Sequence, residues 1–326
     1  LFLEADRMRW LAVNAKNFEN QRAVVQEEYR MRVENAPYAK GLNRLEEITF
    51  ADYGPYAHTT IGSMESLAVA KLEWVTEFYK TYYAPNNAVL TIAGDFDSDR
   101  AMELVRKYFG AAERRSVPAF DASAPAPRPD AKLTRREVVE DKNVNTPGVL
   151  WAFRIPPARS ADHYALELAS QLLSDGESSR LHQKYVRDRP ILQRVGSWTY
   201  DRRGPDELAI MGILTEKAKP EEVERAFTAE LEALRKTPPS LEELTRIKAR
   251  LKHDFLFELQ SNSRRAIRLG EYEVFFGDAR ILTRELAAYL AVTPEDIRRV
   301  ANEYLKPELR FAVDVRPAAR SAGGAK

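Results

Sequence analysis

The sequence predicts an α+β protein of two homologous domains, each an α/β sandwich with helices packed on a mixed or antiparallel sheet, the first domain being incomplete. Strand and helix patterns alternate along the chain, a Pro/Ala-rich segment divides it, and a pattern from the first half recurs near the end. The length of 326 residues is sufficient for two domains. We therefore expect part of a first domain at residues 1–115, a linker at 116–130, a second domain at 131–318 and a disordered tail at 319–326.

The bulk composition is that of an ordinary globular protein, with 44% hydrophobic and 30% charged residues. The 50 basic and 49 acidic residues give a formal charge of +1, so we expect no nucleic-acid partner. No run of about 18 apolar residues occurs, and we expect no membrane span. The chain lacks cysteine, which excludes disulfides and thiolate metal sites but selects no compartment.

A helical pattern over residues 21–32 places one carboxylate on its apolar face. Glu28 shares this face with Val24 and Val25 at i, i+3, i+4 spacing. Its neighbour Glu27 is turned about 100° away. An inward carboxylate must meet a metal, a cation or a cluster of donors, because burial without a partner is costly. The alternative, a salt-bridged or partly exposed glutamate, is the commoner outcome for such a pattern.

The next pattern is helix, strand, helix. The first helix is capped by Ser63 and carries apolar and aromatic residues on its inner side. Residues 87–93 are mostly apolar and β-prone between polar flanks, so we expect a strand that is buried on both faces. Asp97 or Ser98 can cap the second helix, which should end before Gly110.

The second half opens after residues 116–130, whose four prolines and interspersed alanines predict an extended, semi-stiff linker. Apolar runs bounded by turn signals predict the strands, while caps and 3.6-residue periodicity predict the helices. We expect strands at 133–140, 148–155, 198–200, 208–214 and 310–315, and helices at 162–173, at 179–188, from Pro220, from Ser240 to Leu259, and from Thr293.

An internal repeat links the two halves. Ile297, Val300, Tyr304, Pro307 and Phe311 match Val75, Phe78, Tyr82, Pro85 and Val89 in type, at a constant offset of 222 residues. Two copies of one α+β domain explain this spacing. Because the second copy should start near residue 131, the first copy should start upstream of Leu1, and we expect the chain to be truncated at its N-terminus.

Several segments have sequences that are distinctive when they are taken together. They are Phe2–Met8, Gln21–Glu28, Gly54–His58, Ile61-Gly62, the run from Phe78 to Gly110 with its Tyr82-Tyr83, Pro85, Asn87 and Gly94-Asp95, and Ser179–His182. In these segments the chain resembles the M16 family of zinc metallopeptidases, which includes insulinase, pitrilysin and the mitochondrial processing peptidase, and most closely its short bacterial members. The resemblance covers nearly the whole chain.

The resemblance implies a zinc site to which this chain contributes one ligand. In the family, two histidines of a His-x-x-Glu-His (HxxEH) helix and a later glutamate bind zinc, and Glu28 is at the glutamate position. Gln21 stands where an acidic residue often supports that ligand in the family. A glutamine can still donate a hydrogen bond to the ligand carboxylate, but it adds no charge. None of the histidines His58, His163, His182 and His253 forms the motif, which is expected upstream of Leu1. We therefore expect no catalytic residue within these 326 residues, and the chain as given to be inactive.

The family chemistry is metal-assisted hydrolysis of peptides or unfolded segments inside a two-domain chamber. Arg187 is at the position of an arginine that holds the substrate in the family. Alternatively, Arg187 is a solvated charge at a helix end. The family pairs this arginine with a tyrosine, and Gln193 occupies the tyrosine position here. This pattern suggests the metal-bearing subunit of a zinc endopeptidase whose homologous partner, in a hetero- or homodimer, completes the site. The alternative is a non-catalytic subunit that binds peptide or supports a catalytic partner. The resemblance favours a periplasmic or otherwise exported location.

Overall fold

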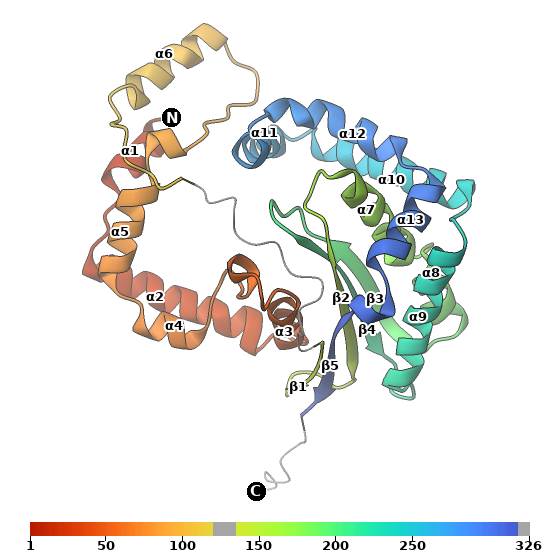
Figure 1. The fold of residues 1–326 in the computed structure, drawn as a ribbon. Coiled ribbons are helices and arrows are strands. Elements are labelled where there is room, and N and C mark those ends of the chain that lie inside the picture. Colours follow the sequence, from red (N-terminus) through yellow and green to blue (C-terminus); the bar gives the residue numbers. More distant parts are fainter. Residues whose placement is uncertain (120–134, 319–326) are drawn as a thin grey trace, which may run out of the picture. The chain divides into compact units, whose positions relative to one another are not determined.

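The computed structural model describes residues 1–119 and 135–318 of the chain. The predicted tail at 319–326 and most of the predicted linker at 116–130 lie outside the described residues. The chain divides into two compact units (Figure 1). Unit 1 comprises Leu1–Tyr29, Ile61–Ser123 and Asp254–Arg284, and unit 2 comprises Arg30–Thr60, Ala124–His253 and Glu285–Lys326.

Unit 2 is built on a mixed five-stranded sheet in the order β1-β5-β2-β4-β3. The pair β1–β5 is parallel and the other pairs are antiparallel, which confirms the predicted mixed sheet. Seven of the eight residues of β2 are buried, because helices cover both faces of the sheet. The strands are β1 (Arg136–Asp141), β2 (Gly148–Ile155), β3 (Leu192–Thr199), β4 (Asp206–Leu214) and β5 (Phe311–Pro317).

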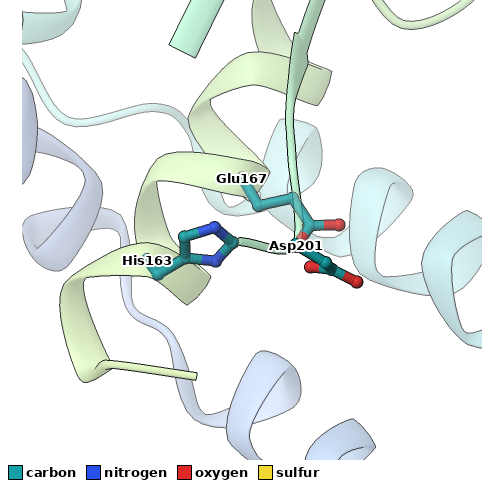
Figure 2. A group of neighbouring side chains, drawn as sticks. All are labelled: His163, Glu167 and Asp201. Atoms are coloured by element: carbon teal, nitrogen blue, oxygen red, sulfur yellow. The ribbon is translucent and has the colours of Figure 1, made fainter. Parts of the chain in front are cut away.

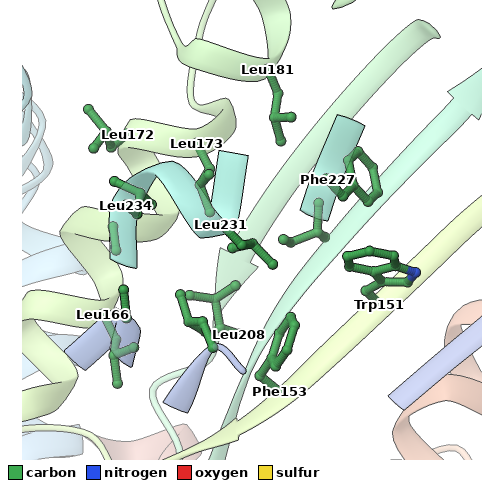
Figure 3. Close-up of a cluster of buried hydrophobic side chains, with 14 of the residues drawn as sticks. Trp151, Phe153, Leu166, Leu172, Leu173, Leu181, Leu208, Phe227, Leu231 and Leu234 are labelled. Carbon is green, nitrogen blue, oxygen red and sulfur yellow. The ribbon is translucent and has the colours of Figure 1, made fainter. Parts of the chain in front are cut away.

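One face of this sheet carries the main hydrophobic core, part of which is drawn in Figure 3. Trp151 and Phe153 of β2 pack there against helices from the second half, and the Trp151 and Phe227 rings lie 5.3 Å apart in an edge-to-face arrangement. Pro220 begins the helix that carries Phe227, as predicted. The helices that contribute to this core are α7 (Ala161–Ser174), α9 (Pro220–Lys236), α10 (Leu241–Glu258), α12 (Leu282–Ala291) and α13 (Pro294–Tyr304), together with the short helix α8 (Arg180–His182) through Leu181.

The opposite face is covered by α3 (Ala39–Thr49), a helix that precedes the linker in sequence. Leu45 and Ile48 are buried against the strand residues of this face. Gly41 permits a close approach, because a Cβ at this position would lie 2.2 Å from a methyl carbon of Val315. Residues 30–60 therefore pack with unit 2, which contains most of the second half of the chain. The sequence analysis instead assigns them to the first of two homologous domains, which are divided at the linker. The homology-based division remains a prediction.

Unit 1 is helical among its described residues. Asp97 caps α6, accepting a 2.7 Å hydrogen bond from the backbone of Arg100. Its helices are α1 (Phe2–Trp10), α2 (Ala15–Tyr29), α4 (Met64–Val69), α5 (Leu72–Tyr82), α6 (Ser98–Phe109) and α11 (Asn262–Phe276). The remaining short elements of the two units are η1 (Arg30–Glu34), η2 (Gly54–Tyr56), η3 (Pro85–Asn87), α8 (Arg180–His182), η4 (Gln183–Asp188), η5 (Ala279–Ile281) and η6 (Pro307–Leu309).

The buried strand predicted at residues 87–93 is wrong. The short helix η3 ends at Asn87, and residues 88–93 form no strand. Val89 and Leu90 are 42% and 44% exposed. A strand needs a neighbouring backbone to pair with, and within residues 1–119 and 135–318 this segment has none in a sheet.

The internal repeat is visible in the helices of the two units. Helix α5 (Leu72–Tyr82) and helix α13 (Pro294–Tyr304) have equal lengths, and each is followed by a 3₁₀ turn that begins at Pro85 or Pro307. These elements correspond at the predicted offset, residue for residue. The repeat ends there, because the chain after η6 enters the sheet as β5 while the chain after η3 does not enter a sheet.

Candidate functional site

The predicted zinc ligand Glu28 lies in the last turn of α2, in unit 1. Its side chain is half-buried while that of Glu27 is exposed, as the helical spacing predicts. The face is less covered than expected, because α2 contains no buried residue and Val24 is 51% exposed. Glu28 is thus positioned on a partly covered helix surface where its carboxylate can meet a ligand or a partner group.

Gln21 lies two helical turns before Glu28, about 10 Å away along the axis. Its exposed side chain borders an apolar cavity of about 480 Å³ within unit 1, which is also lined by Phe18, Val25 and Leu67. At this separation a direct hydrogen bond to Glu28 would require both side chains to extend toward each other. Support of the Glu28 carboxylate by Gln21 remains a prediction.

The four histidines of the chain all lie in unit 2, whereas Glu28 lies in unit 1. Unit 1 therefore offers carboxylates but no imidazole. A catalytic zinc site uses three protein ligands and an open position. The residues of unit 1 therefore cannot supply the two histidines that the resemblance implies, and Glu28 is the ligand predicted from this unit.

Arg187 lies in η4 of unit 2 with 60% of its side chain exposed. Its guanidinium forms a 2.8 Å ion pair with the neighbouring Asp188, and the hydrogen bond to that carboxylate raises the pKa of Arg187. Gln193 is exposed at a β-bulge in β3, between Leu192 and Arg194. The geometry matches a solvated helix-end charge, and a substrate-binding role for Arg187 remains a prediction.

Sequence reasoning missed a buried polar cluster at the start of β4. Arg202 lies over the rings of Phe50 and Tyr200 at 4.9 and 4.6 Å, and its Nη2 donates to Oε1 of Glu46 at 2.6 Å. Glu207 is only 2% exposed. Burial raises the pKa of the Glu207 carboxyl to about 8, since the attraction of Arg202 offsets the desolvation only in part. Adjacent acidic residues at the start of an apolar strand were the available sequence signal.

This pKa predicts that unit 2 loses stability as the pH rises. Between about pH 4.5 and 8 the folded state keeps a proton on Glu207 that the unfolded chain releases, so the free energy of unfolding falls across this window and levels off above it. The Glu207→Gln variant should lack this decline and exceed the parent by on the order of 3 kcal/mol at pH 8.5. Urea titrations at pH 5, 7 and 8.5 measure the difference.

The matched control is Glu216→Gln, which removes an exposed carboxyl from the same unit. Its pH profile should parallel that of the parent. His163 acts in the same direction as Glu207. Burial lowers its pKa, but the Asp206 and Glu167 carboxyl groups and the Tyr200 carbonyl together raise it more, and the resulting stabilisation is lost as the pH rises through the folded pKa. Some decline should therefore survive in Glu207→Gln, and a decline of unchanged size would contradict the assignment to Glu207.

Comparison with known proteins gives consistent matches over nearly the whole chain. The sequence profile of the Peptidase M16 inactive domain matches residues 71–251. The zinc protease PqqE of Helicobacter pylori is 30% identical over 97% of this chain and 71% of its own length. A crystal structure of a protease from Helicobacter pylori has a TM-score of 0.87 at 28% identity, covering 97% of this chain and 76% of that one.

A peptidase M16 inactive domain from Pseudomonas fluorescens shares the fold, with a TM-score of 0.78 at 19% identity over 97% of this chain and 73% of that one. The helices of the described residues include none that is long and apolar enough to cross a membrane. The resemblance found in the sequence segments is confirmed by a family profile that matches more than half of the chain and by a relative that matches nearly all of it. The chain belongs to the M16 peptidase family.

Proposed function

We propose that the protein is the metal-bearing subunit of an M16 zinc endopeptidase and that Glu28 is one of its zinc ligands. The position of Glu28 carries the proposal. Helix α2 presents this carboxylate on a half-covered face and turns Glu27 to solvent. The Helicobacter pylori relative that matches 97% of this chain is named a zinc protease, which supports the same reading.

The proposal requires two further zinc ligands that unit 1 does not supply. Imidazoles are the expected type, since a catalytic site with two histidines and one glutamate leaves an open position for water. The chain as given is accordingly proposed to be inactive alone. Its own contribution is to hold one carboxylate at a fixed place on a helix.

The competing function is a non-catalytic M16 subunit that binds peptide or supports a catalytic partner. The match of residues 71–251 to the inactive-domain profile favours it. Under either function the substrate or ligand is a peptide. The glutamine at position 193 supports a homologous partner subunit, because this chain lacks the tyrosine that would act with Arg187. An exported location remains a prediction.

Zinc content distinguishes the two functions. Protein expressed from the complete gene is dialysed against zinc and assayed by elemental analysis and by cleavage of an unfolded protein substrate, beside Glu28→Gln and Glu27→Gln. We expect Glu28→Gln to contain about one zinc per chain fewer than the parent and Glu27→Gln, with an activity decrease on the order of 100-fold or more. Equal zinc content in all three proteins, with no cleavage of the substrate by the parent, would support the non-catalytic alternative.

A further inference from the structure

A second group of metal-binding side chains lies in unit 2. His163 and Glu167 are one turn apart on α7 and therefore share a helix face. Asp201 comes from the segment that follows β3. The potential ligand atoms of the three side chains lie within 4.8 Å of one another. Figure 2 shows the imidazole ring and the two carboxyl groups turned toward one another.

The imidazole of His163 is completely buried and has one nitrogen to spare. Its Nε2 lies 3.0 Å from Oδ2 of Asp206 and 3.2 Å from the carbonyl oxygen of Tyr200, so Nε2 carries the proton and donates it. Its Nδ1 has no hydrogen-bond partner among the described residues. Metal-bound histidines are typically held in this way, with one nitrogen donating to a carboxylate or carbonyl and the other facing the ion.

The surroundings of the cluster carry excess negative charge. Arg159 forms 2.6 Å contacts with both Asp201 and Glu285, so its charge is shared between two carboxylates. Glu167 is half-buried and accepts a hydrogen bond from the Tyr289 hydroxyl. A divalent ion would add positive charge beside these carboxyl groups.

We propose that His163, Glu167 and Asp201 bind a divalent transition-metal ion, and that Zn²⁺ is the ion that fits best. One imidazole with two carboxylates is a donor set that zinc accepts, whereas magnesium and calcium prefer oxygen ligands alone. Ligands at about 2.1 Å from a tetrahedral ion lie about 3.4 Å apart, so the three side chains must move inward by about 1 Å. Asp201 is 47% exposed, which leaves a route for the ion and for a water ligand.

This site is separate from Glu28, which lies in the other unit, and it does not depend on the proposed peptidase function. The alternative is a cluster held only by hydrogen bonds and by the ion pair between Arg159 and Asp201. The metal site and the hydrogen-bonded cluster predict different responses to added metal. A metal site takes up one equivalent of ion that depends on all three side chains, and a hydrogen-bonded cluster takes up none.

The test uses the full 326-residue chain with Glu28→Gln in every sample, so that binding at Glu28 is not counted. Co²⁺ binding is followed by visible absorption and Zn²⁺ binding by calorimetry, for the parent, Glu167→Gln and Asp201→Asn. Asp188→Asn is the matched control, because it removes an exposed carboxyl from the same unit. Thermal unfolding monitored by circular dichroism verifies that each variant is folded.

We expect one Co²⁺ per parent chain with the absorption bands of a four- or five-coordinate ion. Glu167→Gln and Asp201→Asn should each weaken binding by at least about 10-fold, and Asp188→Asn should remain within about twofold of the parent. The proposal is overturned if the folded parent binds neither metal, or if binding persists unchanged in folded Glu167→Gln and Asp201→Asn. Each result therefore decides for or against the site.

Discussion

Replacing Phe227 by alanine should lower the free energy of unfolding of unit 2 by about 3–5 kcal/mol. Phe227 is fully buried, and its ring meets that of Trp151 edge to face. The packing around it is tight, since a Cβ added to Gly212 would lie 2.9 Å from Cζ of Phe227. The site can therefore collapse little when the ring is removed, and most of the lost contacts remain lost.

Urea unfolding followed by tryptophan fluorescence measures this effect. Trp151 is 2% exposed, while Trp10 and Trp74 of unit 1 are 75% and 55% exposed, so the blue-shifted emission reports on unit 2. Leu241→Ala is the matched control, because Leu241 is 73% exposed and its truncation should change the free energy by less than about 0.5 kcal/mol. Equal midpoints for Phe227→Ala and Leu241→Ala would refute the assignment of Phe227 to the core.

Replacing Arg159 by methionine should cost about 3–5 kcal/mol, because it removes a cation from a buried carboxylate. The Arg159 and Glu285 side chains are 8% and 1% exposed, and their Nε and Oε1 atoms lie 2.6 Å apart. Arg159 also has a φ of 67°, a backbone conformation that is uncommon for a long side chain. The cost arises mainly from the carboxylate left in the interior, since the pair itself gains little over apolar side chains.

A double variant separates these contributions. Arg159→Met with Glu285→Met removes both charges and should recover most of the stability that Arg159→Met loses, as measured by urea unfolding at neutral pH. Arg298→Met is the control, because Arg298 pairs with Glu295 on the exposed surface of α13 and its replacement should leave the free energy of unfolding nearly unchanged. If the loss of unfolding free energy in the double variant equals the sum of the losses in the two single variants, the two charges are not coupled.

Local signals in the sequence predicted much of unit 2. Pro220 begins α9, and the reciprocal hydrogen bonds between Ser240 and Glu243 at the start of α10 are those expected of a capping box. Such signals are reliable because the first turn of a helix is decided by adjacent residues. No helix was predicted over 262–291, where α11 and α12 lie. Arginines interleave with apolar residues in α11, which obscures its apolar stripe.

Features that depend on distant residues were not predictable. The strand pattern at residues 87–93 has the right composition, but pairing requires a partner that local composition does not specify. The face of Glu28 was predictable because helical spacing alone determines it. His163 and Asp206 are 43 residues apart and meet only because α7 packs beside the start of β4. No spacing rule connects such positions.

Helix α3 has a consequence for dividing the gene into fragments. A fragment that begins at residue 131 would contain all five strands but not α3, and it would expose the apolar sheet face formed by Leu150, Ala152 and Val313. Such a fragment should self-associate through that surface. A soluble version should need residues 30–60 supplied in the same chain or as a separate peptide, because these residues complete the sheet that the later sequence builds.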